Sequence, residues 1–215
     1  MDWKKLRESP LFWTIFFAGL AFLLLVLDFA TKWIVQANLK EEGTSICLIP
    51  NFLYITLAYN TGAAFSLGSG TVGGRIFNIA ISIIMSVLFI GYYVISYKKS
   101  GKFLKSILAL LIAGALGNLI DRCFYWKATT GFDGVIDWIQ FYLGGGPNAS
   151  TSIINPFATF NIADACLVIG VILFIVYLIL DSVKTSKEKQ AAENEPNVVP
   201  SDPSMHKDNG EGKDG

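Results

Sequence analysis

The sequence predicts an all-α membrane protein with four transmembrane helices and small β elements in the loops outside the membrane. Of the 215 residues, 53% are hydrophobic and only 16% are charged, which is too apolar for an ordinary soluble domain of this length. Four apolar runs also stand out, and each is close to the ~20 residues that a helix needs to cross ~30 Å of hydrocarbon. We expect helices over about 11–30, 76–97, 103–122 and 161–181, within a transmembrane domain over 1–185.

The first apolar run follows a basic start, so a cleaved signal peptide is the alternative to a transmembrane helix. The run is long for the apolar region of a signal peptide, and no A-x-A cleavage site follows it. We therefore interpret it as an uncleaved span.

The basic residues are unevenly placed, and their distribution predicts the orientation of the helices. Ten of the seventeen flank the same three ends of the predicted helices, at the start of the first, between the second and third, and directly after the fourth: Lys4, Lys5, Arg7, Lys98, Lys99, Lys102, Lys105, Lys184, Lys187 and Lys189. By the positive-inside rule, both termini and the 98–105 connection are cytoplasmic, and the long connections 28–75 and 121–161 are outside. Because the formal net charge is zero, nucleic acid is not an expected partner.

Each outer connection contains a segment with β character. In the first, the side chains of residues 52–57 alternate as expected for a strand, and Asn60-Thr61-Gly62 forms a predicted turn. In the second, GVIDWIQF at 134–141 has a similar pattern. We expect small β elements that rest on the outer membrane surface.

The last segment, 186–215, is polar and has no apolar period. It cannot bury enough apolar surface to offset the entropy of an ordered chain. We predict a disordered cytoplasmic tail.

Cysteine and histidine give no indication of a metal or redox site. Cys47, Cys123 and Cys166 form no C-x-x-C pair, and the only histidine, His206, lies in the tail. We expect no metal and no cofactor. Cys47 and Cys123 both fall outside the membrane, so a disulfide between them stays possible at this point.

The polar residues of the helix ends and outer loops are predicted to meet at one level, the outer interface. The first and third helices run outward and the fourth begins outside, so their polar ends fall beside the outer loops. The residues that converge are Asp28, Lys32, Asn60, Asn118, Asp121, Arg122, Asp137, Asn161 and Asp164. For some of them we favour structural roles: Asp28 with Lys32 and Asp121 with Arg122 as ion pairs, and Asn118 in hydrogen bonds between helices.

Asp137 and Asp164 are the strongest candidates for chemistry. If Asn161 is the N-cap of the fourth helix, Asp164 falls at N3, where the helix dipole and free N–H groups stabilise a carboxylate. Capping is thus an alternative explanation for Asp164, but not for Asp137, which lies between Ile136 and Trp138. Ionisable groups beside a membrane indicate function. Two carboxylates without a histidine or a nucleophile motif predict acid/base activation of water.

Five short motifs follow one another along the chain: DFATK at 28–32, YNTGAAFSL at 59–67, GNLIDR at 117–122, VIDWI at 135–139 and FNIADA at 160–165. Together they resemble the motifs of the lipoprotein signal peptidase family, also called signal peptidase II, over about residues 20–181. Members of that family are aspartic proteases of the bacterial inner membrane. The resemblance implies the same location here, with the active site at the outer face.

The resemblance also implies roles for individual residues and partners. Asp137 and Asp164 match the catalytic pair of aspartates, and the positions that shape or support the site are Asn60, Gly62, Asn118, Asp121, Arg122, Asn161, Asp28 and Lys32. The implied substrates are diacylglyceryl-modified prolipoproteins, which are cleaved on the N-terminal side of the lipidated cysteine. Membrane lipids and globomycin-type inhibitors are further implied partners, and we expect a monomer. Two segments depart from the family pattern: 140–159 is long and rich in Gly and Pro, and a polar tail follows Asp181.

Three other functions are compatible with parts of the sequence. A Ser/Lys protease would use Ser66 and Lys32, but Asp28, one helical turn away, keeps Lys32 charged and unfit as a base. A transporter needs polar residues along a path through the membrane, whereas these stop at one surface. A non-catalytic scaffold has no need for the unpaired Asp137.

Overall fold

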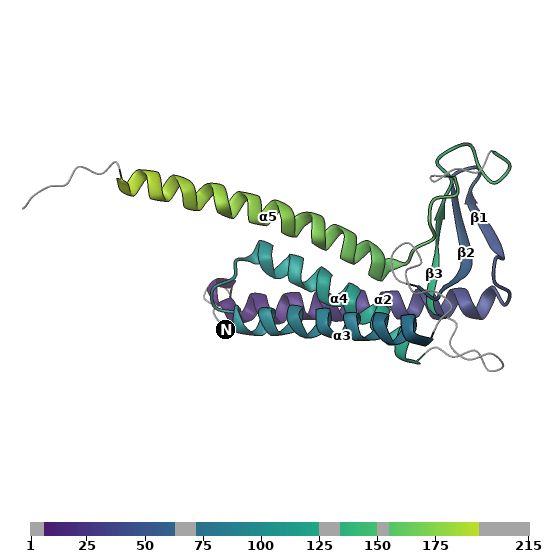
Figure 1. The fold of residues 1–215 in the computed structure, drawn as a ribbon, viewed down its shortest axis with the longest axis horizontal. Coiled ribbons are helices and arrows are strands. Elements are labelled where there is room, and N and C mark those ends of the chain that lie inside the picture. The colour runs from purple at the N-terminus through teal and green to yellow at the C-terminus, as the bar shows by residue number, and fades with distance from the viewer. Residues whose placement is uncertain (1–6, 63–71, 125–133, 150–154, 194–215) are drawn as a thin grey trace, which may run out of the picture. The chain divides into compact units, whose positions relative to one another are not determined.

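The computed structural model describes residues 7–62, 72–124, 134–149 and 155–193. Its contacts divide the chain into two compact units, Met1–Tyr177 and Leu178–Gly215. Within the described residues, Figure 1 shows long helices and short strands. The helices are α2 (Pro10–Asn38), α3 (Val72–Ile95), α4 (Lys102–Phe124) and α5 (Ile162–Glu193), and the strands are β1 (Ser45–Ile49), β2 (Leu53–Asn60) and β3 (Val135–Phe141).

The helices confirm the predicted fold class, because all of α2, α3, α4 and α5 are long and apolar enough to cross a membrane. Large apolar side chains stay exposed along them, including Phe22 at 68% and Val94 at 61%. In water such exposure would be costly, whereas lipid tails are as apolar as the side chains themselves. The exposed apolar side chains of the helices therefore suit a hydrocarbon environment, and the polar groups lie in another part of the fold.

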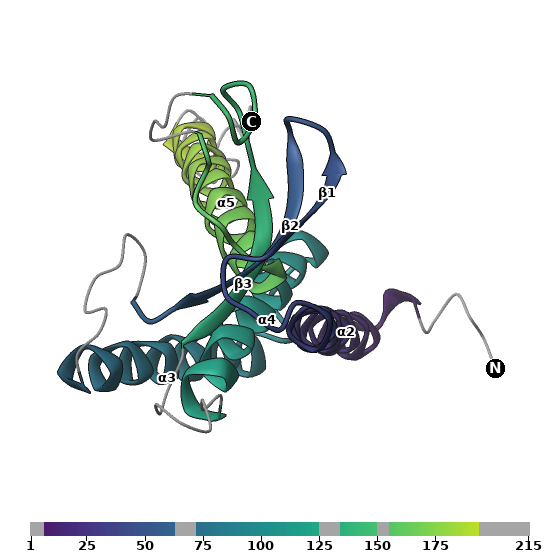
Figure 2. The ribbon, with the colours of Figure 1, turned by 90° about the vertical axis from the view of Figure 1, so that its right-hand side faces the viewer.

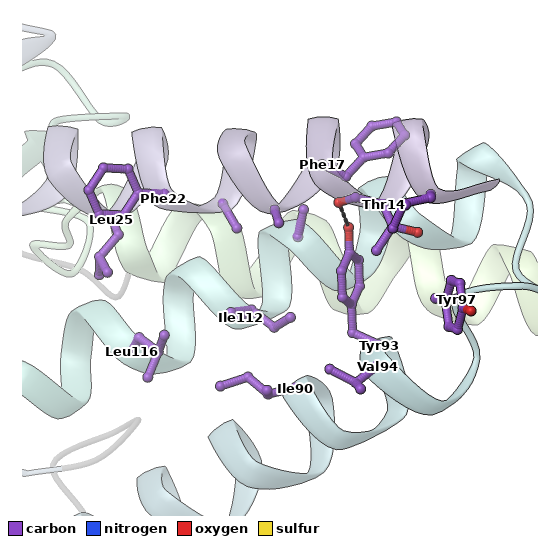
Figure 3. Close-up of a pocket in the computed structure, with 14 residues that line it drawn as sticks. Thr14, Phe17, Phe22, Leu25, Ile90, Tyr93, Val94, Tyr97, Ile112 and Leu116 are labelled. Atoms are coloured by element: carbon purple, nitrogen blue, oxygen red, sulfur yellow. Dashed lines mark hydrogen bonds between the residues drawn. The ribbon is translucent and has the colours of Figure 1, made fainter. Parts of the chain in front are cut away.

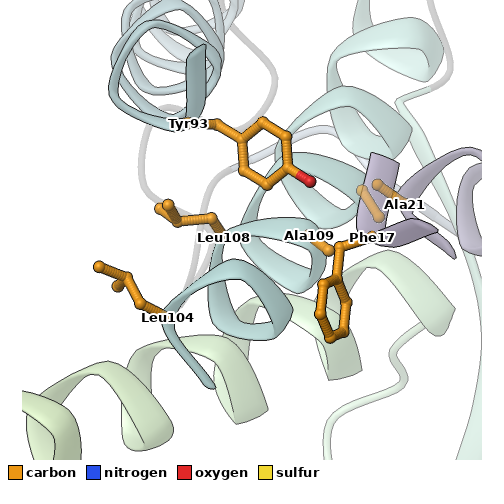
Figure 4. Packing of buried hydrophobic residues seen from close by; sticks show 7 residues of the cluster. Phe17, Ala21, Tyr93, Leu104, Leu108 and Ala109 are labelled. Atoms are coloured by element: carbon orange, nitrogen blue, oxygen red, sulfur yellow. The ribbon is translucent and has the colours of Figure 1, made fainter. Parts of the chain in front are cut away.

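Helix α4 is the central helix of the unit Met1–Tyr177. Its apolar window is 61% buried, whereas those of α2, α3 and α5 are at most 17% buried. Both α2 and α3 pack against α4, and Figure 4 shows the apolar cluster that they share with it. The buried members are Phe17, Ala21, Tyr93, Leu104, Leu108, Ala109 and Ala113. This cluster fixes α4 at one end, and the polar motif GNLIDR occupies the other end.

Two glycines of α4 allow the start of α5 to approach closely. A Cβ added to Gly114 would overlap the backbone oxygen of Ala163, and one added to Gly117 would lie 2.8 Å from the Ala163 Cβ and 2.8 Å from Asp28 Oδ2. Real Cβ atoms do not come this close to other atoms, so a larger residue would force the helices apart. The close approach brings Asn118, the residue after Gly117, against the N-terminus of α5.

Strands β1, β2 and β3 form one antiparallel sheet in that order (Figure 2). In the ladder between β2 and β3, Ala58 pairs with Asp137 and Asn60 pairs with Val135. On the other edge of β3, Ile139 forms a β-bridge with Phe160, the residue before the α5 N-cap. The position of Asp137 is therefore fixed by backbone pairing on both sides of its strand.

The sheet packs on the last turns of α2. Leu57 and Ile136 are fully buried against Val35 and Leu39. The sequence predicts β2 and β3 but not β1, which is short and has exposed side chains. All three cysteines are free, so Cys47 makes no disulfide.

Helix α2 is longer than the sequence predicts, because it ends at Asn38 rather than near residue 30. The expected end rests on Asp28 and Lys32, which interrupt the apolar run. In the structure both side chains are buried and form an ion pair, so the helix continues past them. Its additional turns are the ones that support the sheet.

The predicted start of the disordered tail is wrong, because α5 continues through residues 186–193. This stretch lacks an apolar period but is rich in Lys, Glu, Gln and Ala, which are good helix formers. An ion pair between Lys184 and Glu188 at 3.7 Å has the i, i+4 spacing that supports a helix. The rest of the predicted tail, 194–215, lies outside the described residues.

Candidate active site

The N-terminus of α5 holds Asn161 and Asp164 in a reciprocal capping arrangement. The N–H of Asp164 donates to Asn161 Oδ1 at 2.9 Å, and the N–H of Asn161 donates to Asp164 Oδ2 at 3.3 Å. This is the geometry of a capping box, with Asn161 as N-cap and Asp164 at N3, as predicted. The other oxygen, Asp164 Oδ1, accepts a hydrogen bond from Asn118 Nδ2 at 2.7 Å. The carboxylate is thus held by donors from both α4 and α5.

Asp137 lies on β3, only 3% exposed, between two asparagine side chains. Its Oδ1 accepts from Asn161 Nδ2 at 2.7 Å, and its Oδ2 accepts from Asn60 Nδ2 at 3.2 Å. Asn60 is itself fixed, because its Oδ1 accepts from the N–H of Gly62 at 3.0 Å. Gly134, just before β3, has a φ of +108°, and a Cβ there would overlap the Asn60 backbone. Glycine at this position therefore keeps the two strands close enough for the Asn60 contact.

Asn161 connects the two carboxylates. It is fully buried, and its Nδ2 also lies 3.3 Å from Asn118 Oδ1 and 3.3 Å from the carbonyl oxygen of Ile136. Its side-chain amide binds Asp137, while its backbone N–H and its Oδ1 bind Asp164. Asn161 therefore fixes the position of Asp137 on β3 relative to that of Asp164 on α5.

The surroundings of Asp137 favour its protonated form. Burial is the largest effect, followed by the nearby Asp164 charge, and together they raise the pKa of Asp137 to about 7. The hydrogen bonds from Asn60 and Asn161 and the charge of Lys32 act in the opposite direction but are smaller. Near neutral pH Asp137 can therefore carry a proton, as the acid of a catalytic pair of carboxyl groups must.

A second buried cluster joins α2 to α4. Lys32 Nζ lies 2.7 Å from Asp28 Oδ2 and 2.9 Å from Asp121 Oδ2, and all three side chains are at most 3% exposed. The predicted Asp28–Lys32 pair is confirmed. The predicted partner of Asp121 is wrong: Asp121 pairs with Lys32, and the described residues show no ion pair between Asp121 and Arg122. The sequence favours Arg122 only because it is adjacent in the chain.

The two acids of this cluster also hold the backbone next to each candidate catalytic residue. Asp28 Oδ1 accepts from the N–H of Ala163 at 2.8 Å, one residue before Asp164. Asp121 Oδ2 accepts from the N–H of Ile136 at 3.2 Å, one residue before Asp137. Lys32 links these two acids, so the Asp28–Lys32–Asp121 cluster clamps β3 and the start of α5 at a fixed separation.

Arg122, the residue after Asp121, adds a positive charge near the site. Its guanidinium interacts electrostatically with Asp164, Asp121 and Asp137. Its Nη1 donates to Ser82 Oγ of α3 at 3.1 Å. Ser82 is a contact that the sequence analysis did not include. The signal for it is weak: Asn78, Ser82 and Ser86 recur at i, i+4 on an otherwise apolar helix.

This arrangement can be compared with known proteins. The family model described as signal peptidase (SPase) II matches residues 20–180 of the chain. The chain belongs to the signal peptidase II family. A lipoprotein signal peptidase of Bacillus pumilus (strain SAFR-032) is 32% identical over 173 residues, which is 80% of this chain and 98% of that relative.

Two solved structures, each described as a bacterial membrane enzyme determined by the in meso method, resemble the fold. The first is 34% identical with a TM-score of 0.59, and the match covers 79% of this chain and 88% of that one. The second is 32% identical with a TM-score of 0.55, and the match covers 77% of this chain and 91% of that one. The fold of this member of the signal peptidase II family is therefore similar to that of solved bacterial membrane enzymes.

All the signal peptidase II positions identified from the sequence lie in or beside one polar cluster. Asn60, Asn118 and Asn161 surround the two candidate catalytic acids, and the clamp of Asp28, Lys32 and Asp121 lies against the same backbone. The alternative nucleophile, Ser66, lies outside the described residues. Within those residues, no three His, Cys, Asp or Glu side chains are grouped as a metal site would require.

Proposed function

We propose that this member of the signal peptidase II family is an aspartic endopeptidase whose catalytic residues are Asp137 and Asp164. The family cleaves signal peptides from prolipoproteins, so the reaction is hydrolysis of a peptide bond. The observation that carries the proposal is the bridge through Asn161, which holds two carboxyl groups together while one of them has a pKa of about 7. A capping role explains Asp164 alone but gives no reason for a second buried acid beside it.

The first step follows from the unequal surroundings of the two acids. The α5 N-terminus and Asn118 stabilise charge on Asp164, so Asp164 is the base that takes a proton from water. The water oxygen forms a bond with the scissile carbonyl carbon. Asp137 gives its proton to the carbonyl oxygen, and a neutral tetrahedral diol results.

The second step returns each group to its starting state. Asp164, now protonated, gives its proton to the nitrogen of the leaving cysteine as the C–N bond breaks. Asp137 takes back a proton from one hydroxyl of the diol, which becomes the new carboxyl group. The products are the signal peptide, with a free C-terminus, and a mature chain that begins with cysteine.

We propose diacylglyceryl-prolipoproteins as the substrate class, because the site lies where hydrocarbon and polar surface meet. Asp164 is three residues into a helix that can span the membrane, and Asp137 is on a sheet outside any such helix. A substrate that is part lipid and part peptide presents its cleavage point at the same level. Membrane lipids and globomycin-type inhibitors are partners that share this amphipathic character.

We propose the bacterial inner membrane, with both termini in the cytoplasm and the acidic pair at the outer face, because the basic residues flank the other ends of the helices. We also propose a monomer with one transmembrane domain over 1–185, since one chain is sufficient to form the hydrogen bonds and ion pairs that hold the two acids.

The proposal is tested with purified protein and two forms of one prolipoprotein, with and without the diacylglyceryl group. We expect cleavage of the lipidated form only, with cysteine as the new N-terminus by mass spectrometry, and equal activity in a Ser66→Ala variant. Loss of activity in Ser66→Ala would indicate a serine nucleophile and contradict the aspartic mechanism. Efficient cleavage of the unlipidated form would contradict the proposed substrate class.

A further inference from the structure

An apolar cavity of about 520 Å³ lies between α2, α3 and α4, as Figure 3 shows. It begins beside Leu11 and Tyr97, at the end of the helices opposite the acidic pair, and reaches Leu25 and Leu116. Leu11 and Leu25 are fourteen residues apart on one helix, which corresponds to about 21 Å. The cavity is therefore elongated and follows the direction of the spans.

The cavity occupies a gap in the helix packing. Helices α2 and α3 each pack against α4, and no comparable packing joins α2 to α3 among the described residues. Leu11, Phe22 and Val94 line the cavity and are at least 55% exposed, so it opens on the surface that faces hydrocarbon. A bilayer component can enter it from the side.

The walls offer almost no free hydrogen-bonding group. The Thr14 hydroxyl donates to the Pro10 carbonyl at 2.9 Å, and the Tyr93 hydroxyl donates to the Thr14 carbonyl, as the dashed line in Figure 3 indicates. Both groups are thus satisfied within the protein. What fills the cavity must be hydrocarbon along most of its length.

Positive charge gathers at the end of the cavity that is farthest from the acidic pair. Lys98 Nζ lies 5.6 Å from the centre of the Tyr97 ring, and Lys102 Nζ lies 4.0 Å from the centre of the Trp13 ring, next to Thr14. Both lysines are exposed, and neither has a carboxylate partner among the described residues. Lys105, in contrast, is buried, and its Nζ donates to the carbonyl oxygens of Tyr97 and Ser100.

We infer that this cavity is a binding site for an anionic phospholipid, with an acyl chain between α2 and α3 and the head-group phosphate beside Lys98 and Lys102. Basic side chains at a membrane surface attract anionic lipids. The residues that line the cavity do not include Asp137, Asp164 or the side chains that hold them, so the inference does not depend on the aspartic mechanism. A bound lipid would supply the packing that α2 and α3 lack, and would stabilise the fold by mass action.

The signal peptide of the substrate is the main alternative occupant, and two features disfavour it. Its positively charged start would fall beside Lys98 and Lys102, which repel it. A helix of about 21 Å with side chains also occupies roughly 1,600–2,400 Å³, several times the volume of the cavity. An acyl chain is much narrower and carries no positive charge.

The test compares phosphatidylglycerol with phosphatidylcholine of identical acyl chains, added to the delipidated full-length protein in detergent. We expect native mass spectrometry to show one tightly bound phosphatidylglycerol, about tenfold preferred over phosphatidylcholine, and a higher unfolding temperature with that lipid. Ala18→Phe, which fills the cavity, should remove the bound lipid. Gly19→Phe is the matched control, since Gly19 faces open space, and it should behave like the wild type.

A double variant, Lys98→Gln with Lys102→Gln, tests the head-group contact without changing the acyl-chain site, and it replaces no buried residue. It should keep one bound lipid but lose the preference for phosphatidylglycerol. Equal binding of both lipids by the wild type, or lipid binding by Ala18→Phe as strong as by Gly19→Phe, would overturn the assignment. Crosslinking of a photoreactive residue at Val94 to the substrate's signal peptide, and not to lipid, would show that the signal peptide occupies the cavity.

Discussion

Replacement of Lys32 by methionine tests the clamp that holds the two acidic residues. Lys32 is fully buried and is the ion-pair partner of two carboxylates, Asp28 at 2.7 Å and Asp121 at 2.9 Å. Methionine has a similar length and volume but no charge. The variant therefore leaves two acids buried and unpaired, each about 2% exposed or less.

The expected loss of stability is large for a single substitution. Removal of one partner from a buried ion pair typically costs 3–5 kcal/mol, and here a single cation serves two acids. The total free energy of unfolding of a natural domain is only about 5–15 kcal/mol. We therefore expect Lys32→Met to lower the free energy of unfolding by at least about 3 kcal/mol, and to lower activity as well, since the N–H groups of Ala163 and Ile136 lose their fixed acceptors.

The assay is equilibrium unfolding in mixed micelles, followed by circular dichroism, for Lys32→Met and for a triple variant that adds Asp28→Asn and Asp121→Asn. The triple variant removes all three charges but keeps an oxygen acceptor for each backbone N–H. It should recover most of the lost stability. A Lys32→Met protein within about 1 kcal/mol of the wild type, or a triple variant no more stable than the single one, would refute the clamp.

Three further predictions concern the site itself. Because Asp137 must be protonated and its pKa is about 7, kcat/KM should fall about tenfold for each pH unit above that value, as a pH–rate profile can show. Asn60→Ala removes a hydrogen bond that lowers the pKa of Asp137, so the fall in kcat/KM should begin at a higher pH. An unchanged pH–rate profile would contradict the assignment of Asp137 as the acid. Ser82→Ala should lower kcat/KM about fivefold by releasing Arg122, whereas Ser86→Ala, one turn away, should not; equal effects would refute a role for Ser82.

The sequence predicts the helices well because composition and length decide them. A run of about twenty apolar residues has few alternatives to a membrane span. The ends are harder to predict, as Asp28 and Lys32 show: charged residues indicate the end of a span when viewed singly, but a buried ion pair lets α2 continue to Asn38. Helix α5 also ends later than predicted, but for another reason: good helix formers extend it without any apolar period.

The convergence of the polar residues also follows from the sequence, whereas their partners do not. The topology brings Asn118, Asn161 and Asp137 to one level, and the structure joins them by hydrogen bonds. The pairing of Asp121 with Lys32 depends on how α2 and α4 are rotated about their axes, and no local pattern contains that information. The same is true of the contact between Arg122 and Ser82.

The central claim is that Asp137 and Asp164 exchange protons with the substrate, and replacement of each by asparagine tests it most directly. Asparagine keeps the size and an acceptor oxygen of aspartate but cannot gain or lose the required proton. Asp181→Asn, at an exposed position of the same helix as Asp164, is the matched control. Processing of a diacylglyceryl-prolipoprotein is measured at equal concentrations of folded protein. We expect no detectable cleavage by Asp137→Asn or Asp164→Asn and wild-type cleavage by Asp181→Asn; near-normal turnover by either of the first two would contradict the aspartic mechanism.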